Sequence, residues 1–174
     1  CALCIFFLLV HTVLCVSFYK EKVKRGSGKL LKMRISTTEP FTKLSHQVYV
    51  VLRDKFREKA EQMGMQRVAS PLPFDTCYNE SSVGWASKGY NVPIIKLGLP
   101  GSGRTWDVMG YNSMLWVSPG VLCWTLLDAG YNKTSVLGTL QQQDHLLEFD
   151  LSLKTLNFLD FYQSSATSCS NFYF

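Results

Sequence analysis

The chain has 174 residues, of which 47% are hydrophobic and 18% are charged, a composition that fits one globular domain and excludes a disordered chain. The net charge of +5 arises from basic residues in the first 67 positions, but no aromatic residues are interleaved with them as stacking platforms, which argues against nucleic-acid binding. The aromatic content of 13% and the repeated Thr, Val and Tyr favour β structure.

Residues 1–27 are predicted to form a hydrophobic segment followed by a basic linker. Residues 1–19 are almost wholly apolar, and several Lys and Arg follow at 20–25. Three interpretations stay open: a cleaved signal peptide, a membrane anchor through residues 1–19, or a stretch that is not native to the domain. The basic residues would hold the domain of an anchored protein in the cytoplasm. Residues 28–174 are predicted to form the domain itself.

The cysteines and two sequons point to an oxidising compartment. Cys77, Cys123 and Cys169 are too far apart in sequence for the close pairs of a zinc site, and they have the character of disulfide partners. Asn79 and Asn132 each begin an N-x-S/T sequon for N-glycosylation. We therefore expect a secreted, extracellular protein.

One amphipathic helix is predicted over residues 46–63. Ser45 is a suitable N-cap, and Leu44 and Tyr49 stand at the positions of a hydrophobic staple. Apolar residues then recur at intervals of three and four, and Gly64 provides the stop. Pro40 keeps the preceding segment out of the helix.

After Pro73 the pattern changes to short strands separated by Gly, Asn, Ser and Pro. Strands are expected at 92–97 and 106–109, joined by a turn at 100–103. Residues 121–127 are apolar almost without interruption, which predicts one strand covered on both faces. The pattern also predicts a strand at 145–149 and a turn at 152–155. The fold class is therefore mainly β, with a single helix.

Motifs for a cofactor or a metal are weak. Residues 98–105 approach a phosphate-binding loop, but Arg104 replaces the required Lys and a strand-like segment follows instead of a helix. His11, His46 and His145 lie in unrelated segments without metal-ligand spacing. No G-x-S-x-G elbow supports a serine nucleophile. We expect no cofactor and no metal.

A series of short matches runs through residues 31–174. It comprises Arg34-Ile35-Ser36-Thr37, Pro40, Thr42, Pro73-Phe74, Cys77-Tyr78, Val92-Pro93, Trp106, Asn112-Ser113-Met114, Leu122-Cys123, Gly138, Asp144, Glu148-Phe149-Asp150-Leu151, Phe158 and Cys169-Ser170-Asn171-Phe172. This series resembles the C-terminal lobe of plant pepsin-like proteins (peptidase A1), in the branch of xylanase inhibitors, extracellular dermal glycoproteins and basic seed globulins. Phe74–Tyr78 and Gln141–Gln143 are more similar to the proteolytic members.

The resemblance places Ser36 at a catalytic position. Active members use two aspartates, one from each lobe, which share a proton because two adjacent carboxylates cannot both ionise. The second-lobe motif reads Asp-Ser/Thr-Gly, so its three positions correspond here to Ser36, Thr37 and Thr38. A serine hydroxyl supplies no carboxylate charge, and no Asp-Thr-Gly occurs elsewhere in the chain. No catalytic residue is therefore expected.

The resemblance also implies a disulfide, a partner and a location. Cys77 and Cys123 would form the disulfide within the lobe, and Cys169, whose partner lies in the first lobe of the family, would be unpaired. The implied function is a non-catalytic lobe, located in the cell wall, that binds or inhibits cell-wall-degrading glycosidases. The alternative is a fragment of an aspartic endopeptidase. A lobe without its partner lobe should expose an apolar face.

Overall fold

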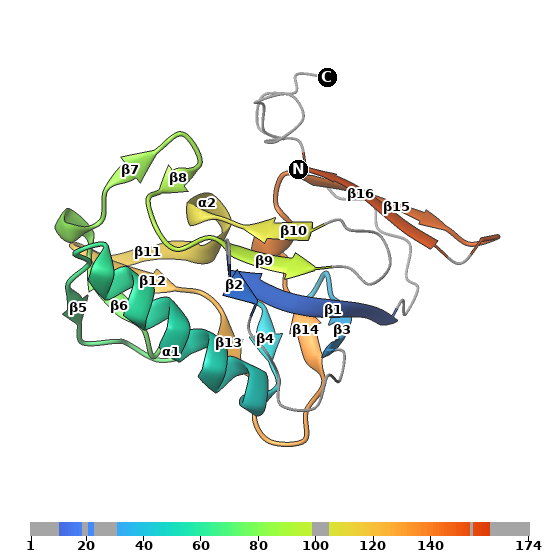
Figure 1. Ribbon diagram of the computed structural model, residues 1–174, viewed down its shortest axis with the longest axis horizontal. Helices are drawn as coiled ribbons and strands as arrows, with labels where there is room; N and C mark the ends of the chain where they lie inside the picture. Colours follow the sequence, from blue (N-terminus) through green and yellow to red (C-terminus); the bar gives the residue numbers. More distant parts are fainter. Residues whose placement is uncertain (1–10, 19–20, 23–30, 99–104, 154, 161–174) are drawn as a thin grey trace.

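The computed structural model describes residues 11–18, 21–22, 31–98, 105–153 and 155–160 (Figure 1). Within these residues the protein is mainly β, and its long helix α1 (His46–Gln62) packs across the sheets. The largest sheet has eight strands, and a four-stranded sheet lies beside it. The mainly β fold class with one long amphipathic helix is confirmed.

The eight-stranded sheet holds the segments before and after the expected catalytic position. Strand β14 (Ser135–Leu137) lies between β3 (Leu31–Ile35) and β4 (Lys43–Leu44), parallel to the first and antiparallel to the second. The remaining strands extend the sheet on both sides, and β2 (Glu21–Lys22) pairs with β1. The spatial order is β10 (Thr105–Val108), β9 (Ile95–Gly98), β1 (His11–Phe18), β3 (Leu31–Ile35), β14 (Ser135–Leu137), β4 (Lys43–Leu44) and β13 (Leu127–Asp128).

The smaller elements surround the second sheet. Its strands are, in spatial order, β11 (Met114–Ser118), β12 (Val121–Trp124), β6 (Cys77–Asn79) and β5 (Arg67–Val68). Two hairpins stand apart from both sheets, namely β7 (Trp85–Ala86) with β8 (Gly89–Tyr90) and β15 (His145–Asp150) with β16 (Thr155–Asp160). The short helical turns are α2 (Gly110–Ser113), η1 (Glu80–Ser82) and η2 (Leu140–Gln142).

Helix α1 follows its sequence pattern closely. It begins at His46 after the N-cap Ser45, and it ends at Gln62, one residue before the predicted end. The Ser45 side chain makes no capping bond; instead its backbone N–H donates to Ser135 Oγ at 2.9 Å. Gly64 adopts a φ of 82°, a left-handed conformation in which glycine has no Cβ penalty.

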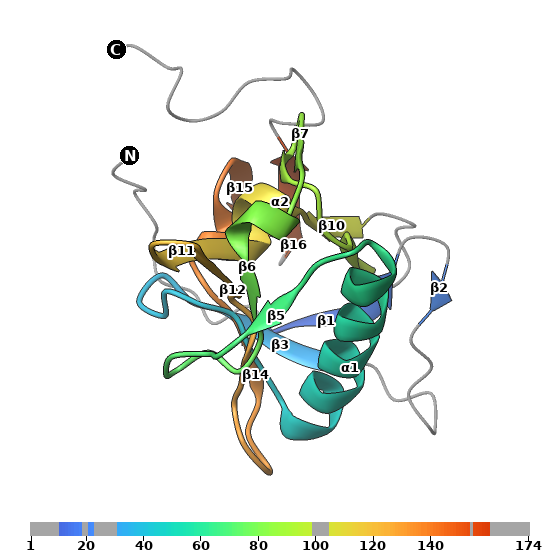
Figure 2. The same cartoon turned by 90° about the vertical axis from the view of Figure 1, so that its left-hand side faces the viewer.

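The core lies between α1 and the two sheets (Figure 2). The helix buries one face, which consists of Tyr49, Leu52, Phe56 and Ala60. The Phe56 ring stacks on Trp124 of β12 at a centroid distance of 4.8 Å. The fully buried Leu52 and Phe56 therefore fix the helix against the sheet.

Two predicted strands differ from the observed ones. The apolar run 121–127 is divided into β12 and β13, because Thr125 donates both its N–H and its hydroxyl to the Ser113 carbonyl, each at 2.9 Å. The chain thereby leaves one sheet and enters the other. The strand expected from residue 92 begins only at Ile95, since Pro93 has no N–H for a sheet hydrogen bond.

The first part of the chain contains a strand. Residues 11–18, which the sequence assigned to a hydrophobic segment before the lobe, form β1 and pair with β3 and β9. Among the described residues, no helix combines the length and the hydrophobicity needed to cross a membrane. The division of the chain between residues 27 and 28 stays a prediction. The turn expected at 100–103 and Cys169 fall outside the described residues.

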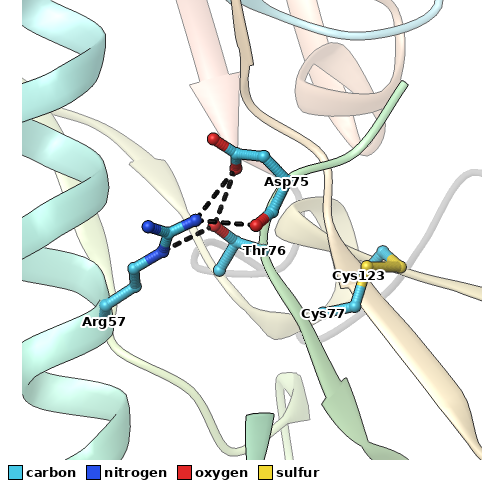
Figure 3. Close-up of a disulfide and its surroundings, with 5 residues drawn as sticks. All are labelled: Arg57, Asp75, Thr76, Cys77 and Cys123. Atoms are coloured by element: carbon cyan, nitrogen blue, oxygen red, sulfur yellow. Dashed lines mark hydrogen bonds and ion pairs between the residues drawn. A yellow bond between two sulfur atoms is a disulfide. The ribbon is translucent and has the colours of Figure 1, made fainter. Parts of the chain in front are cut away.

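Cys77 and Cys123 form a disulfide bond between the adjacent strands β6 and β12 (Figure 3). Both cysteines are fully buried, and they pack with Phe74 and Leu127 in a second, smaller apolar cluster. The pairing that the resemblance implied is thus present in the structure.

Candidate functional site

The expected catalytic position lies in a loop that crosses the end of a strand. Residues 36–42 connect β3 to β4, and β14 occupies the space between these two strands. The loop therefore passes over the C-terminal end of β14. Backbone bonds hold it there: Ser36 N–H donates to the Leu137 carbonyl at 3.0 Å, and Thr139 N–H donates to the Glu39 carbonyl at 2.8 Å.

The Ser36 hydroxyl is engaged by its own loop. Its oxygen accepts from the backbone N–H groups of Thr38 at 3.3 Å and Glu39 at 3.2 Å. The Thr38 hydroxyl lies 3.2 Å away as a further partner. With 7% of its surface exposed, Ser36 acts as a local cap for the turn. The position thus has the hydrogen bonds of a structural serine.

Two buried glutamines tie the loop to the rest of the fold. Gln142 Nε2 donates to the Ser36 carbonyl at 2.7 Å and to the Leu137 carbonyl at 3.0 Å. Gln141 Oε1 accepts from Thr42 N–H at 2.8 Å, while its Nε2 donates to Asn112 and Thr125. The sequence analysis used Gln141–Gln143 only as a family mark, because contacts between residues about a hundred positions apart carry no local signal.

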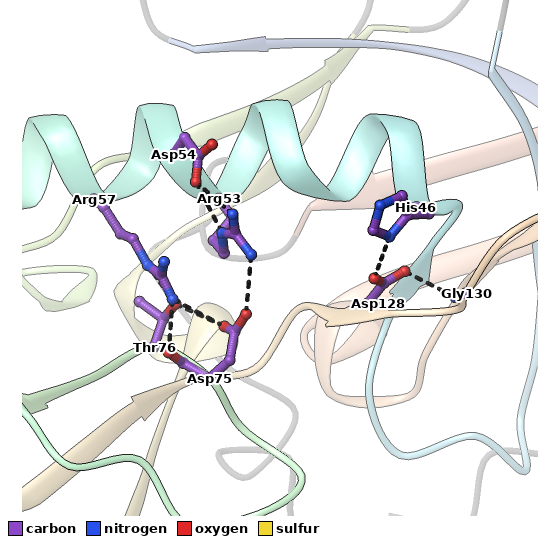
Figure 4. A network of polar contacts seen from close by, with 8 residues as sticks. All are labelled: His46, Arg53, Asp54, Arg57, Asp75, Thr76, Asp128 and Gly130. Carbon is purple, nitrogen blue, oxygen red and sulfur yellow. Dashed lines mark hydrogen bonds and ion pairs between the residues drawn. The ribbon is translucent and has the colours of Figure 1, made fainter.

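The acidic side chain of this loop does not replace the missing aspartate. Glu39 forms an ion pair with Lys43 at 2.6 Å. Asp128 lies on β13, which pairs with β4: its Oδ2 lies 2.6 Å from His46 Nδ1, and its Oδ1 accepts from Gly130 N–H (Figure 4). Both carboxylates therefore have partners of their own.

The comparison with known families agrees with this geometry. The family model described as "Xylanase inhibitor C-terminal" matches residues 11–160, which is most of the chain. The chain belongs to this family.

Plant proteins are similar to this chain in sequence. A "Probable aspartic proteinase GIP2" of Nicotiana benthamiana is 36% identical over 143 residues, covering 81% of this chain and 32% of that protein. "Gamma conglutin 1" of Prunus dulcis is 33% identical, with 80% and 33% covered. The chain thus spans about a third of the length of these curated relatives. The resemblance stated from the sequence is confirmed.

Solved structures show the same lobe. The crystal structure of edgp is 25% identical, with a TM-score of 0.75 over 94% of this chain and 48% of that one. The crystal structure of basic 7S globulin from soybean has a TM-score of 0.76 at 22% identity, over 95% of this chain and 46% of that one. The pepsin-like lobe is therefore the fold of this family member.

A polar cluster joins α1 to the segment that leads into β6. Arg57 donates from Nε to Thr76 Oγ1 at 2.9 Å and from Nη2 to the Asp75 carbonyl at 2.7 Å (Figure 3). Partial burial alone would raise the pKa of Asp75, but hydrogen bonds from Tyr49 and Thr76 and the charges of Arg57 and Arg53 hold that pKa below its ordinary value. The cluster stabilises the helix–sheet contact.

The other predicted residues lie apart from the loop. Asn79 ends β6, and its Oδ1 accepts from Ser81 N–H at 3.1 Å, whereas Asn132 is exposed in the turn between β13 and β14. His145 is buried and stacks on Trp106 at a centroid distance of 4.2 Å, and burial lowers the pKa of its ring. Within the described residues, no group of His, Cys, Asp or Glu could hold a metal ion.

Proposed function

We propose that this chain is a non-catalytic pepsin-like lobe that binds and inhibits cell-wall-degrading glycosidases of microbes. The observation that supports a non-catalytic role is the state of Ser36. Its hydroxyl stands where an active lobe carries a carboxylate, and two backbone N–H groups of its own loop already donate to it. A hydroxyl cannot share a proton with a second aspartate in the way that peptide cleavage by this family requires.

Membership of the family described as "Xylanase inhibitor C-terminal" supports the inhibitory part of the proposal. In this chain the 36–42 loop crosses β14, but position 36 carries a hydroxyl in place of a charged carboxylate. The lobe would then have the fold of an aspartic protease lobe without its catalytic group. Such a framework can present surface loops to the cleft of a partner enzyme. We further propose that a second, N-terminal lobe completes the protein, because the matched residues make up only about a third of the length of the relatives.

The same proposal places the protein outside the cell. The Cys77–Cys123 disulfide is stable in an oxidising compartment. Glycans on Asn79 and Asn132 would agree with that location, and Asn132 is exposed as an acceptor must be. Expression in a secreting plant cell followed by glycosidase treatment and mass spectrometry tests both positions.

The central test is inhibition of a glycosidase. The purified full chain should slow xylan hydrolysis by one or more enzymes in a panel of microbial xylanases, in a saturable manner, and should form a complex with that enzyme in size-exclusion chromatography. The chain denatured by reduction and alkylation is the control and should not inhibit. If no enzyme in the panel is slowed or bound, the proposed function is wrong.

A second candidate is a fragment of an aspartic endopeptidase. The printed name of the relative at 36% identity, "Probable aspartic proteinase GIP2", favours it. This candidate requires that the chain cleaves peptides at acid pH and that a transition-state-mimicking peptide blocks the cleavage. Such a result would overturn the non-catalytic proposal.

A further inference from the structure

The hairpin β15–β16 rests on the core through one of its faces (Figure 1). Within the described residues its two strands pair only with each other, so side-chain contacts hold it against the rest of the fold. Leu147 and Phe158 pack against the main core cluster. His145 and Asp160, which are paired at the base of the hairpin, are its most buried residues, with 3% and 9% of their surface exposed.

The ring of His145 makes the closest aromatic contact between the hairpin and β10. It lies nearly parallel to the indole of Trp106, with an interplanar angle of 6° and the centroids 4.2 Å apart. The Phe158 ring lies 6.5 Å from it and 5.2 Å from the indole. The indole itself is held in place, because its Nε1–H donates to the Gln141 carbonyl at 2.9 Å. His145 therefore packs on a fixed aromatic surface.

The two ring nitrogens of His145 have different surroundings. Nδ1 lies 2.9 Å from the Gln143 carbonyl, which can only accept, so Nδ1 carries the hydrogen of the neutral ring. Nε2 is buried and has no hydrogen-bond partner among the described residues. In the neutral ring Nε2 presents only a lone pair. Protonation would place a charged N–H there without an acceptor, and a buried charge that lacks a partner costs much more free energy than a buried lone pair.

Burial lowers the pKa of His145, and the charged groups around the ring offset this effect only in part. Asp160 lies opposite His145 in the hairpin register, Asp144 precedes it in the chain, and Asp107 lies on β10. All three carboxylates favour the protonated ring. The charge of Asp107 is itself compensated by an ion pair with Lys96 on β9. Loss of water around the ring therefore dominates, and the docked hairpin favours neutral His145.

We propose that His145 is a pH-sensitive latch, which holds β15–β16 on the core while its ring is neutral and releases the hairpin when acid protonates it. In the released hairpin the imidazolium is hydrated, and Leu147 and Phe158 become exposed. The released form binds the proton more readily than the docked form does. Docking is therefore fully favoured above about pH 6.5, the ordinary value for histidine, and weakens as the pH falls below it. The latch does not depend on glycosidase inhibition.

Amide hydrogen exchange of the full chain, followed by nuclear magnetic resonance, tests the latch. Protection factors compare each amide with an unstructured chain at the same pH, which cancels the intrinsic pH dependence of exchange. Between about pH 7.5 and about pH 5, the factors of β15–β16 should fall about three- to thirtyfold, the upper bound for a pH about 1.5 units below the ordinary histidine pKa. Those of α1 and β12 should stay unchanged. A hairpin that keeps its protection, or loses it in step with α1, overturns the proposal.

Variants assign the effect to one ring. His145→Phe keeps an aromatic ring beside Trp106 but cannot be protonated, so the hairpin should be equally protected at both pH values. His145→Gln is a second neutral replacement, and its amide can donate to the Gln143 carbonyl if the Phe variant folds poorly. His46→Gln removes a partly exposed imidazole on α1, outside the hairpin, and should show the same fall as the parent. A fall that persists in both His145 variants, or that disappears in His46→Gln, overturns the proposal.

Discussion

Ser36 brings a hydroxyl, and no carboxylate, to the loop between β3 and β4. Its oxygen accepts from the backbone of Thr38 and Glu39, as a capping group in a tight turn does. A hydroxyl offers acceptor lone pairs but carries no charge near neutral pH. Ser36 therefore helps to hold the loop together through neutral hydrogen bonds.

At the residue scale, Ser36→Ala should lower the free energy of unfolding by about 1 kcal/mol, because two N–H groups in a partly buried loop lose their acceptor. The midpoint of urea unfolding measures this loss. Ser87→Ala, on an exposed turn, is the matched control and should change the midpoint little. Equal midpoints for the two variants would contradict the structural role of Ser36.

Asp75 should make stability depend on pH. Its pKa in the folded state is lower than in the unfolded chain, so its contribution is present above the unfolded pKa of about 4 and is lost as the pH falls through the folded value. Because 41% of its side chain is exposed, the contribution is at most about 1 kcal/mol.

Urea unfolding from pH 6 to about pH 2 tests this sign. Asp75→Asn should reduce the acid loss of stability, whereas Glu61→Gln, which removes an exposed carboxylate of helix α1, should leave it unchanged. An undiminished acid loss in Asp75→Asn would contradict the assignment.

At the scale of elements, the crossing of the 36–42 loop over β14 is a tightly constrained feature. Gly138 follows β14 directly beneath the loop, and a Cβ atom there would lie 2.2 Å from the carbonyl carbon of Phe41. Gly138 N–H also donates to Thr42 Oγ1 at 3.0 Å. Glycine is thus required by close contact between two backbones and not by its own dihedral angles.

Gly138→Ala should therefore destabilise the protein by about 3 kcal/mol or more, since backbone on both sides of the contact must move. Gly84→Ala, where the nearest atom to an added Cβ is 3.7 Å away, is the control and should be tolerated. Thermal unfolding followed by circular dichroism distinguishes the two. A stable Gly138→Ala variant would show that the loop does not cross β14 this closely.

At the scale of the whole molecule, the disulfide closes a long loop. Cys77 and Cys123 are 46 residues apart in sequence and lie on adjacent strands, so the bond encloses β7 to β11. In the chain-entropy model such a link stabilises the fold by about 4 kcal/mol, mainly by restricting the unfolded chain.

Reduction should lower the denaturation midpoint by a corresponding amount. The measurement is urea unfolding with and without dithiothreitol. The double variant Cys77→Ala/Cys123→Ala should be less stable than the parent, and dithiothreitol should not destabilise it further. If reductant affects the variant and the parent equally, other cysteines account for the change.

The hairpin β15–β16 exposes apolar side chains on one face. Leu146 and Leu159 are opposite each other in its register and are 53% and 43% exposed, while Phe158 and Leu147 on the other face pack against the core. The sequence predicted an exposed apolar face for an isolated lobe, and this pair is a candidate for part of it.

The purified chain should therefore bind a hydrophobic dye and self-associate as its concentration rises. Leu146→Ser/Leu159→Ser should reduce both effects, as measured by dye fluorescence and analytical ultracentrifugation. Val51→Ser/Met63→Ser, at one exposed apolar position of α1 and one directly after it, is the control. A parent chain that stays monomeric and binds no dye would contradict the prediction.

The sequence predicted correctly those elements that are determined by residues close together in the chain. Helix α1 was placed within one residue because its N-cap, its apolar spacing and Gly64 lie within twenty residues of one another. The run 121–127 was predicted as one strand because hydrophobicity alone contains no sign of the bonds from Thr125 to Ser113 that divide it. The spacing of Asn112-Ser113 before Leu122-Cys123 was a family mark, but it did not indicate this contact.

By itself, the sequence determined that Ser36 brings no carboxylate to the lobe, since residue identity fixes which groups can ionise in any fold. The tertiary structure alone decided that this hydroxyl caps its own loop, that Gln142 ties the loop to β14, and that His145 stacks on Trp106. These arrangements depend on side chains brought together from distant positions, as far apart as the 106 residues between Ser36 and Gln142, and only the folded chain creates such contacts.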